Sequence, residues 1–234
     1  MATPSFHKFI ITCEHASNSI PEEFAYLFEG ALEILNSHRG WDPGASKVAY
    51  AISKTLKAPL FEFIFSRLLI EPNRSAHHPR LFSEFSAKLT SAEKAFLLDN
   101  YYKPYRWSVE REIESILLEN QSLIHLGIHS FTPKLNESKR SMDIGLLYDP
   151  SRPLEKNFCS NWKNVILDID PKLRVRMNQP YKGTSDGFTT TLREKFGPSY
   201  AGIELEVNQA YFTGDKESES KIINTLTTSL LHVQ

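Results

Sequence analysis

The chain has 234 residues, of which 41% are hydrophobic and 24% are charged, which predicts one globular domain over residues 1–234 with a large core. A formal net charge of −1 gives no reason to expect nucleic acid or a membrane as a partner, and two cysteines are too few for a disulfide framework. No apolar run reaches membrane-spanning length, and the first residues lack the hydrophobic centre of a signal peptide, so we expect a soluble cytoplasmic protein.

Apolar patterning predicts strands that alternate with helices. Short apolar or aromatic-rich runs indicate strands over Lys8–Cys13, Leu60–Ser66, Ser122–His129, Asp143–Tyr148, Leu173–Met177 and Tyr200–Val207. Helical spacing indicates helices over Ala45–Lys57, from Thr90 or Ser91 to about Glu119, and over Leu154–Leu167, Phe188–Phe196 and Glu217–Leu231. Pro104 is expected to break or kink the second of these helices. The alternation is typical of an α/β sandwich around a mostly parallel or mixed central sheet.

Polar residues capable of chemistry lie where the predicted strands end. His15 follows the first strand, and Arg67 follows the second. His129 ends the third strand, and Glu206 lies near the end of the last. Ligands of α/β sheets bind beyond the carboxyl ends of the strands, so we expect these residues to share one site.

His15 and His129 are candidate metal ligands, because neutral imidazole binds Zn²⁺ and catalytic zinc sites use three protein ligands with an open position. The bland alternative is that each histidine is merely hydrogen-bonded or partly exposed. Asp42 is the best third ligand, although an aspartate before a Pro-Gly turn is also a common turn or helix-capping residue. Glu14 is its rival, but adjacent residues of a strand face opposite ways, which makes joint ligation with His15 harder.

Arg67, Asn73 and Arg74 are candidate binding residues. The planar guanidinium fits a carboxylate, and an asparagine beside it adds a donor, so the group could hold an acidic substrate or polarise a carbonyl. The alternative is an internal salt bridge with Glu71 or Glu62, and the two interpretations are equally supported.

Glu204 and Glu206 lie on the same face of one predicted strand. Two carboxylates at that spacing repel each other unless a cation, an arginine or a proton lies between them, which favours a functional role. A glutamate beside zinc can accept a proton from water and return it to a leaving amine. The alternative is that one of the two faces solvent on an edge strand.

Six segments, in chain order, resemble the N-formylglutamate amidohydrolase family: CEHASNSIP, GWDPGA, SRLLIEPNR, IHSFTP, NQPYKGTSDGF and LEVNQAYF. The resemblance covers nearly the whole chain. It implies a fold related to the zinc-dependent exopeptidases, a phosphorylase/hydrolase-like three-layer α/β/α sandwich with a mixed central sheet. It also implies cleavage of the formyl amide of N-formylglutamate to formate and glutamate, with one Zn²⁺ or another divalent ion as cofactor.

The resemblance also implies a role for each matching residue. His15, His129 and Asp42 would hold the metal, Glu206 rather than Glu204 would be the general base, and Arg67 would help to stabilise the oxyanion. The residues that would bind the small acidic N-acyl amino acid are Asn73, Arg74 and Asn208. A carboxypeptidase or cell-wall-type amidase acting on short peptides, and a non-catalytic binder of acidic ligands, remain alternatives.

Overall fold

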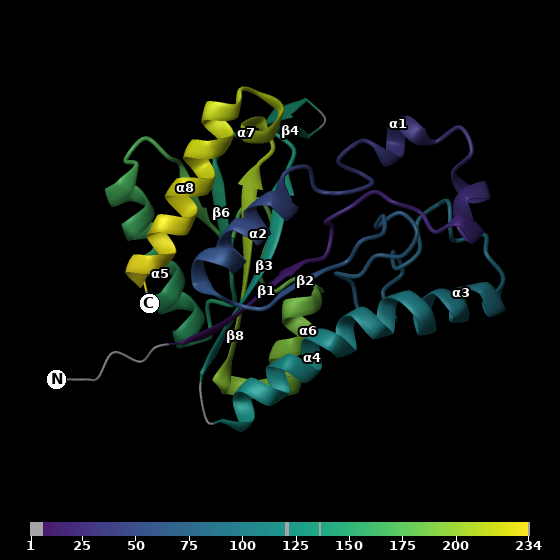
Figure 1. The fold of residues 1–234 in the computed structure, drawn as a ribbon, viewed down its shortest axis with the longest axis horizontal. Coiled ribbons are helices and arrows are strands. Elements are labelled where there is room, and N and C mark those ends of the chain that lie inside the picture. The colour runs from purple at the N-terminus through teal and green to yellow at the C-terminus, as the bar shows by residue number, and fades with distance from the viewer. Residues whose placement is uncertain (1–6, 120–121, 136, 234) are drawn as a thin grey trace.

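A mixed six-stranded sheet forms the centre of the molecule (Figure 1). The computed structural model describes residues 7–119, 122–135 and 137–233, so the first six residues, on which the signal-peptide prediction partly depends, lie outside it. The strands are β1 (Lys8–Cys13), β2 (Leu60–Glu62), β3 (Leu123–Phe131), β6 (Ile144–Leu147), β7 (Val175–Met177) and β8 (Tyr200–Asn208). Their order in the sheet is β2-β1-β3-β8-β6-β7. The first four of this order are parallel, whereas β6 is antiparallel to β8 and parallel to β7.

Helices cover both faces of the sheet. One face carries α2 (Ala45–Leu56), α5 (Pro153–Ile169) and α8 (Lys216–Val233), and the other carries α4 (Lys103–Leu118) and α6 (Phe188–Phe196) (Figure 1). Each face has its own apolar core, and successive strand residues serve the two cores in turn: Ile10 packs into one and Ile11 into the other. This arrangement confirms the predicted three-layer α/β/α sandwich with a mixed sheet. Among the described residues, no helix is both long and apolar enough to cross a membrane.

The predicted long helix forms, with an irregular middle. It consists of α3 (Ser91–Leu97), a π-helix (Leu98–Tyr102) and α4, and Thr90 caps its start in a capping box with Glu93. Pro104 lies in the first turn of α4 and has no N–H to donate to a carbonyl of the preceding turn. Just before it, the backbone N–H of Lys103 donates to the carbonyl of Leu98, five residues earlier, which is the hydrogen-bond spacing of a π-helix.

The predicted strand Leu60–Ser66 is too long. Only Leu60–Glu62 pairs with the sheet, at its outer edge, and the following segment leaves the sheet. The reason is aromatic packing: Phe63 packs edge-to-face on Tyr105, and Phe65 packs on Tyr101. The aromatic-rich composition of this segment is typical of a strand, but after Glu62 its rings pack against residues of the π-helix and α4.

Several short elements were not predicted, because none is long enough to show a period. They are the 3-10 helices Glu22–Phe28 and Gly197–Ser199, the helices α1 (Leu32–Leu35) and α7 (Ala210–Thr213), and the two-stranded sheet of β4 (Lys134–Leu135) and β5 (Ser138–Lys139).

His125 is buried inside the sheet, where its ring nitrogens lie 2.7 Å from Oγ1 of Thr12 and 2.5 Å from the Tyr200 hydroxyl. Burial lowers its pKa from the usual 6.5 to about 4, although the charge of Glu14 opposes this. A histidine whose pKa is lower in the folded state is protonated first in the unfolded chain. Between pH 6.5 and pH 4, His125 therefore binds a proton in the unfolded chain but not in the folded protein, so the free energy of unfolding falls as the pH falls.

We expect this loss to reach about 3 kcal/mol at pH 4. Urea unfolding of the protein and of His125→Gln at pH 7 and pH 4 measures it: the variant should lose less stability than the wild type between the two pH values. His232→Gln, on the exposed end of α8, is the matched control and should follow the wild type. Equal losses for the wild type and His125→Gln would contradict the prediction.

Candidate metal centre and its cavity

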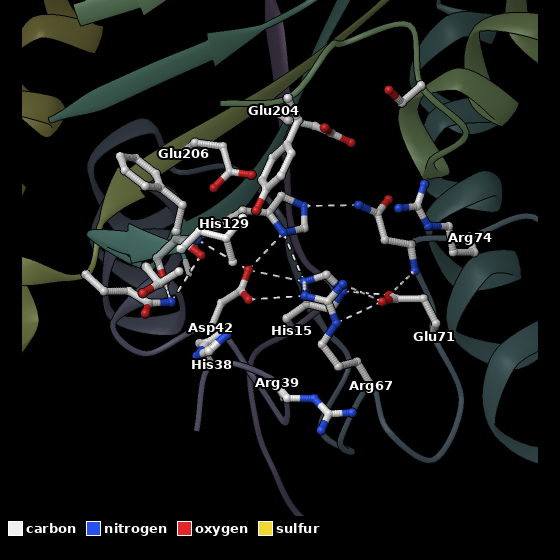
Figure 2. A pocket seen from close by; sticks show the side chains of 18 of the residues that line it. His15, His38, Arg39, Asp42, Arg67, Glu71, Arg74, His129, Glu204 and Glu206 are labelled. Atoms are coloured by element: carbon white, nitrogen blue, oxygen red, sulfur yellow. Dashed lines mark hydrogen bonds and ion pairs between the residues drawn. The ribbon is translucent and has the colours of Figure 1, made fainter. Parts of the chain in front are cut away.

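A cavity of about 400 Å³ opens where β1, β3 and β8 end (Figure 2). Every residue that the sequence analysis assigned to the site lines it, except Asn208. The walls come from segments far apart in the chain: the turn after β1, the segment before α2, the loop of residues 66–74, the ends of β3 and β8, and the loop of residues 181–186. The expected convergence at the strand ends is therefore observed.

Three donor atoms form a small triangle at the base of the cavity. Nδ1 of His15 lies 3.1 Å from Oδ2 of Asp42, Nδ1 of His129 lies 3.1 Å from the same oxygen, and the two nitrogens are 3.2 Å apart (Figure 2). Ligands that are 2.0–2.1 Å from a tetrahedral zinc ion are about 3.3 Å from one another. The triangle therefore has the dimensions of one face of a zinc coordination tetrahedron.

The backbone fixes this triangle. The N–H of Asp42 donates to the carbonyl of His15 (3.0 Å), and the N–H of Ser130 lies 3.3 Å from Oδ2 of Asp42. Asp42 is not a helix cap, because Gly44 is the N-cap of α2 and no side chain caps that helix, but it does begin the turn before α2, where its carbonyl accepts from the N–H of Ala45 (3.1 Å). Gly44 has a left-handed φ of 86°, and a Cβ there would lie 2.1 Å from the Phe212 ring, so only glycine fits this turn.

Two further carboxylates contact the remaining nitrogens of the histidines. Nε2 of His15 lies 2.6 Å from Oε1 of Glu71, and Nε2 of His129 lies 3.2 Å from Oε2 of Glu14. From the sequence, Glu14 is only a rival ligand beside His15, and Glu71 is only a salt-bridge partner of Arg67. In the structure Glu14 is outside the triangle and contacts His129. Both glutamates lie in segments that resemble the family, and this resemblance is the signal in the sequence that could have pointed to a role for them.

The cluster carries a surplus of negative charge that matches a divalent cation. Asp42, Glu14 and Glu71 contact the two imidazoles, and Arg67 is the cation that contacts this group. With both imidazoles neutral, the form in which they bind a metal, three carboxylates against one guanidinium leave two negative charges in a buried region. The chemistry of the donors, two imidazole nitrogens and a carboxylate oxygen, is also that of catalytic zinc sites. The residues therefore fit a Zn²⁺ ion.

The pKa values reflect the mutual attraction between the carboxylates and the basic side chains of this cluster. Burial on its own would raise the pKa of Asp42 and of Glu71, but the neighbouring cations and hydrogen bonds hold both well below their usual range. Glu14 behaves likewise, and its pKa falls to about 2. Burial would lower the pKa of His129, but the neighbouring carboxylates of Asp42 and Glu14 raise it well above 6.5. The site thus attracts positive charge strongly.

Arg67 forms the internal salt bridge that was one of its two interpretations. Its Nε and Nη2 donate to Oε2 of Glu71, at 2.8 and 2.6 Å, and Glu62 instead accepts a hydrogen bond from Ser46. Its Nη1 lies 3.2 Å from Nδ1 of His15 and 3.4 Å from Oδ1 of Asp42. The fork is therefore held by Glu71 while one nitrogen faces the donor triangle.

Arg74 lies across the cavity from Asp42 (Figure 2), and Asn73 lines the same cavity. Oδ1 of Asn73 accepts a hydrogen bond from the N–H of Phe188 (2.8 Å), and its Nδ2 lies 3.5 Å from Nε2 of His129. Arg74 donates through Nη1 to the carbonyl of Asp186. The buried Arg106 fixes their backbone, because its Nη1 donates to the carbonyls of Pro72 and Arg74 at 3.1 and 3.2 Å.

Asn208 is not part of the cavity wall, so its assignment as a substrate-binding residue is corrected. Its Nδ2 donates to the carbonyl of Met142 (2.8 Å), and its Oδ1 accepts from the N–H of Ala210 (3.0 Å). Both ends of the buried amide therefore hold the chain where β8 passes into α7. Its neighbour Gln209 lines the cavity instead.

Glu206 and Glu204 both line the cavity but differ in environment. Glu206 is opposite His129 in the β3–β8 register, is buried, and its Oε2 has no hydrogen-bond partner among the described residues. Burial first, then the charges of Asp42 and Glu204, raise its pKa to about 8, although both histidines oppose this. Glu204 instead accepts a hydrogen bond from Thr189 (3.2 Å). The alternative of an exposed edge-strand glutamate is wrong, because β8 lies between β3 and β6.

The loop that supplies Tyr181, Lys182, Ser185 and Asp186 was not predicted as part of the site. It packs tightly against the end of β6: Oδ1 of Asn178 accepts hydrogen bonds from the N–H groups of Tyr148 and Gly183, both at 3.0 Å. A Cβ at Gly183 would lie 2.1 Å from the Tyr148 nitrogen, so a side chain there would displace the loop. The wall is therefore built by close backbone packing, which periodicity does not show.

Known proteins resemble this chain over nearly its whole length. The chain is similar to the gene product Atu2144 from Agrobacterium tumefaciens, with 26% identity and a TM-score of 0.79 over 98% of this chain and 92% of that one. It shares its fold with the N-formylglutamate amidohydrolase from Ralstonia eutropha JMP134, with 18% identity and a TM-score of 0.72 over 98% and 94% of the two chains. No curated protein matches significantly. The family model described as N-formylglutamate amidohydrolase matches residues 7–213, and the chain therefore belongs to the N-formylglutamate amidohydrolase family.

Proposed function

We propose that the protein is a zinc-dependent amidohydrolase that cleaves a small acidic N-formyl amino acid such as N-formylglutamate into formate and glutamate. The observation that carries the proposal is the triangle of His15, Asp42 and His129, with the buried and unpaired Glu206 beside it. Family membership supports amide hydrolysis, and the Ralstonia relative is named for this substrate.

Nδ1 of His15, Oδ2 of Asp42 and Nδ1 of His129 would hold the ion. A bound zinc supplies Lewis-acid polarisation of the scissile carbonyl and acidifies a water molecule. Glu206 takes a proton from the attacking water, whose oxygen bonds to the formyl carbon. The C–N bond then breaks, and Glu206 returns the proton to the departing amine nitrogen.

The environment of Glu206 suits this double role. A group that both accepts and returns a proton works best with a pKa near the operating pH. Burial brings the pKa of Glu206 to about 8, and a divalent cation among the donors would lower it toward neutrality. An exposed glutamate would keep its proton too weakly to deliver it to an amine.

Arg67 is the donor for the negative charge that develops on the carbonyl oxygen. Two of its nitrogens are committed to Glu71, so the guanidinium is held in place before substrate enters, and Nη1 faces the triangle. A preorganised donor of this kind costs no reorganisation when the charge forms.

Arg74 and Asn73 would bind the carboxylate of the substrate. Both line the wall beside His129, and Arg106 holds their backbone rigidly. A guanidinium with an amide donor beside it fits a carboxylate group. The substrate is therefore acidic, and its amide carbonyl points toward Arg67.

The test combines metal analysis with a substrate panel. We expect one zinc per chain, loss of turnover on chelation, and recovery on adding Zn²⁺. We also expect kcat/KM for N-formylglutamate to exceed that for one of its two monoamides, N-formylglutamine or N-formylisoglutamine, by about tenfold or more, since a charge-assisted hydrogen bond contributes about 1.5–3 kcal/mol.

The same panel carries the contrary outcomes. Faster cleavage of short peptides than of any N-formyl amino acid would replace the proposal with a peptidase or amidase acting on peptides. Tight binding of acidic ligands with no product from the zinc-loaded protein would make the chain a non-catalytic binder. A protein that binds no divalent ion would contradict the proposed metal-dependent hydrolysis itself.

A further inference from the structure

We propose that Glu14 is a positioning residue that selects the Nε2–H tautomer of His129 and so leaves the Nδ1 electron pair of that ring free for a metal ion. The proposal rests on the proposed function, because it concerns the metal ligand His129, but it assigns a role to a residue outside the donor triangle.

The two nitrogens of His129 face different surroundings. Nδ1 faces the triangle, 3.2 Å from Nδ1 of His15 and 3.1 Å from Oδ2 of Asp42. Nε2 faces away from it and lies 3.2 Å from Oε2 of Glu14, a buried oxygen that has no hydrogen-bond partner among the described residues. A neutral imidazole carries its proton on one nitrogen and its electron pair on the other. A carboxylate can only accept, so Glu14 favours the proton on Nε2.

A second group competes for Nε2 of His129. Nδ2 of Asn73 lies 3.5 Å away and is a donor, because Oδ1 of this amide is engaged with the N–H of Phe188. A donor at Nε2 would favour the opposite tautomer, with the proton on Nδ1, which could not bind a metal. Glu14 is closer and charged, so it decides between the two tautomers.

Hydroxyl groups hold the Glu14 carboxylate in place. The buried Tyr105 hydroxyl donates to Oε1 at 3.1 Å, and the Thr12 hydroxyl also donates to the carboxylate. Because the Thr12 hydroxyl has a single proton, it must accept from Nε2 of His125, and Nδ1 of the neutral ring then accepts from the Tyr200 hydroxyl. Each donor in this chain points toward Glu14. The buried carboxylate is thereby oriented with Oε2 toward His129.

Glu14 differs from Glu71, which contacts Nε2 of His15 at 2.6 Å. Glu71 shares its charge with Arg67, through contacts of 2.8 and 2.6 Å. In the described part of the chain no lysine or arginine forms an ion pair with Glu14. No guanidinium or ammonium group among these residues therefore shares the charge of Glu14 with His129, and replacing Glu14 affects the ligand without breaking an arginine salt bridge.

Glu14→Gln is the sharpest single change. Tyr105 donates to Oε1, so the amide oxygen of the new side chain stays there and its NH₂ group faces Nε2 of His129. Two donors would then surround Nε2 and favour the tautomer with the proton on Nδ1. We expect the Kd for Zn²⁺, measured by chelator competition, to rise about 10–100-fold. In the Co²⁺-substituted protein the absorption of the tetrahedral ion should weaken.

Tyr105→Phe combined with Glu14→Gln provides the rescue. The double variant keeps the Thr12 hydroxyl but loses one of the two donors that orient the amide, so part of the protein can turn the amide oxygen toward Nε2, and Zn²⁺ affinity should partly recover relative to Glu14→Gln alone. A merely structural role of Glu14 predicts the reverse, because the double variant loses more contacts. Glu62→Gln is the matched control: Glu62 lies on β2, and its carboxylate accepts a hydrogen bond from Ser46. This variant should bind Zn²⁺ like the wild type.

The wild type gives an independent readout. In the zinc-loaded protein, ¹⁵N shifts of the His129 ring should show the metal on Nδ1 and a hydrogen-bonded proton on Nε2. Metal on Nε2, an unchanged Zn²⁺ affinity of Glu14→Gln, or no recovery in the double variant would each overturn the proposal while leaving a zinc hydrolase intact. A wild type that binds no Zn²⁺ would instead overturn the proposed function itself.

Discussion

Glu206→Gln should lower kcat for amide hydrolysis about 10²–10⁴-fold while the protein keeps its full zinc content. The substitution keeps the size of the side chain and removes its capacity to accept a proton. Glu206 is buried and its Oε2 is unpaired among the described residues, so the variant breaks no hydrogen bond of that oxygen. Steady-state kinetics with N-formylglutamate, together with metal analysis of the same sample, measures both quantities.

Glu204→Gln is the matched comparison for that experiment. Glu204 lies two residues away on the same strand face, but its carboxylate already accepts a hydrogen bond from Thr189. We expect a smaller loss of kcat than for Glu206→Gln. A larger loss in Glu204→Gln, with full turnover of zinc-loaded Glu206→Gln, would transfer the general-base role to Glu204.

His129→Ala should abolish stoichiometric zinc binding and, with it, all zinc-dependent turnover. The change removes one corner of the triangle and the partner of both Asp42 and Glu14. Its effect on the Kd for Zn²⁺ should therefore exceed the 10–100-fold typical of a group that only orients a ligand. Chelator competition and metal analysis after dialysis measure the loss.

The same variant leaves buried carboxylates without their histidine, and breaking a buried pair costs about 3–5 kcal/mol. His129→Gln keeps a polar side chain at this position and separates loss of metal from loss of fold, which circular dichroism monitors. His232→Ala, on the exposed last turn of α8, is the control and should keep both zinc and activity. One tightly bound zinc per chain in folded His129→Gln and His129→Ala would contradict the proposed ligand set.

The sequence by itself determined most of the regular elements. Lys8–Cys13 and Phe188–Phe196 form as predicted, and other strand and helix boundaries differ by a few residues. The reason is local: apolar periodicity and capping groups act over a few residues, so they can be read without knowledge of the fold. The segment after Glu62 is the exception, because its aromatic rings pack on residues of the π-helix and α4, far along the chain.

The sequence also indicated His15, Asp42 and His129 as partners, through their positions at strand ends and the family resemblance. It could not show which atoms meet. That depends on β1 and β3 lying side by side in the sheet and on the register that sets His129 opposite Glu206.

Only the tertiary structure decided the surroundings of these residues. Glu14 contacts His129 rather than its neighbour His15, Glu71 contacts His15 across 56 residues of chain, and Asn208 turns away to hold Met142. Each of these depends on side-chain orientation between segments that are distant in the chain, for which neither spacing nor composition carries a signal. The sequence therefore predicts which residue types form the site, whereas the neighbours that orient these side chains and shift their pKa values depend on tertiary packing.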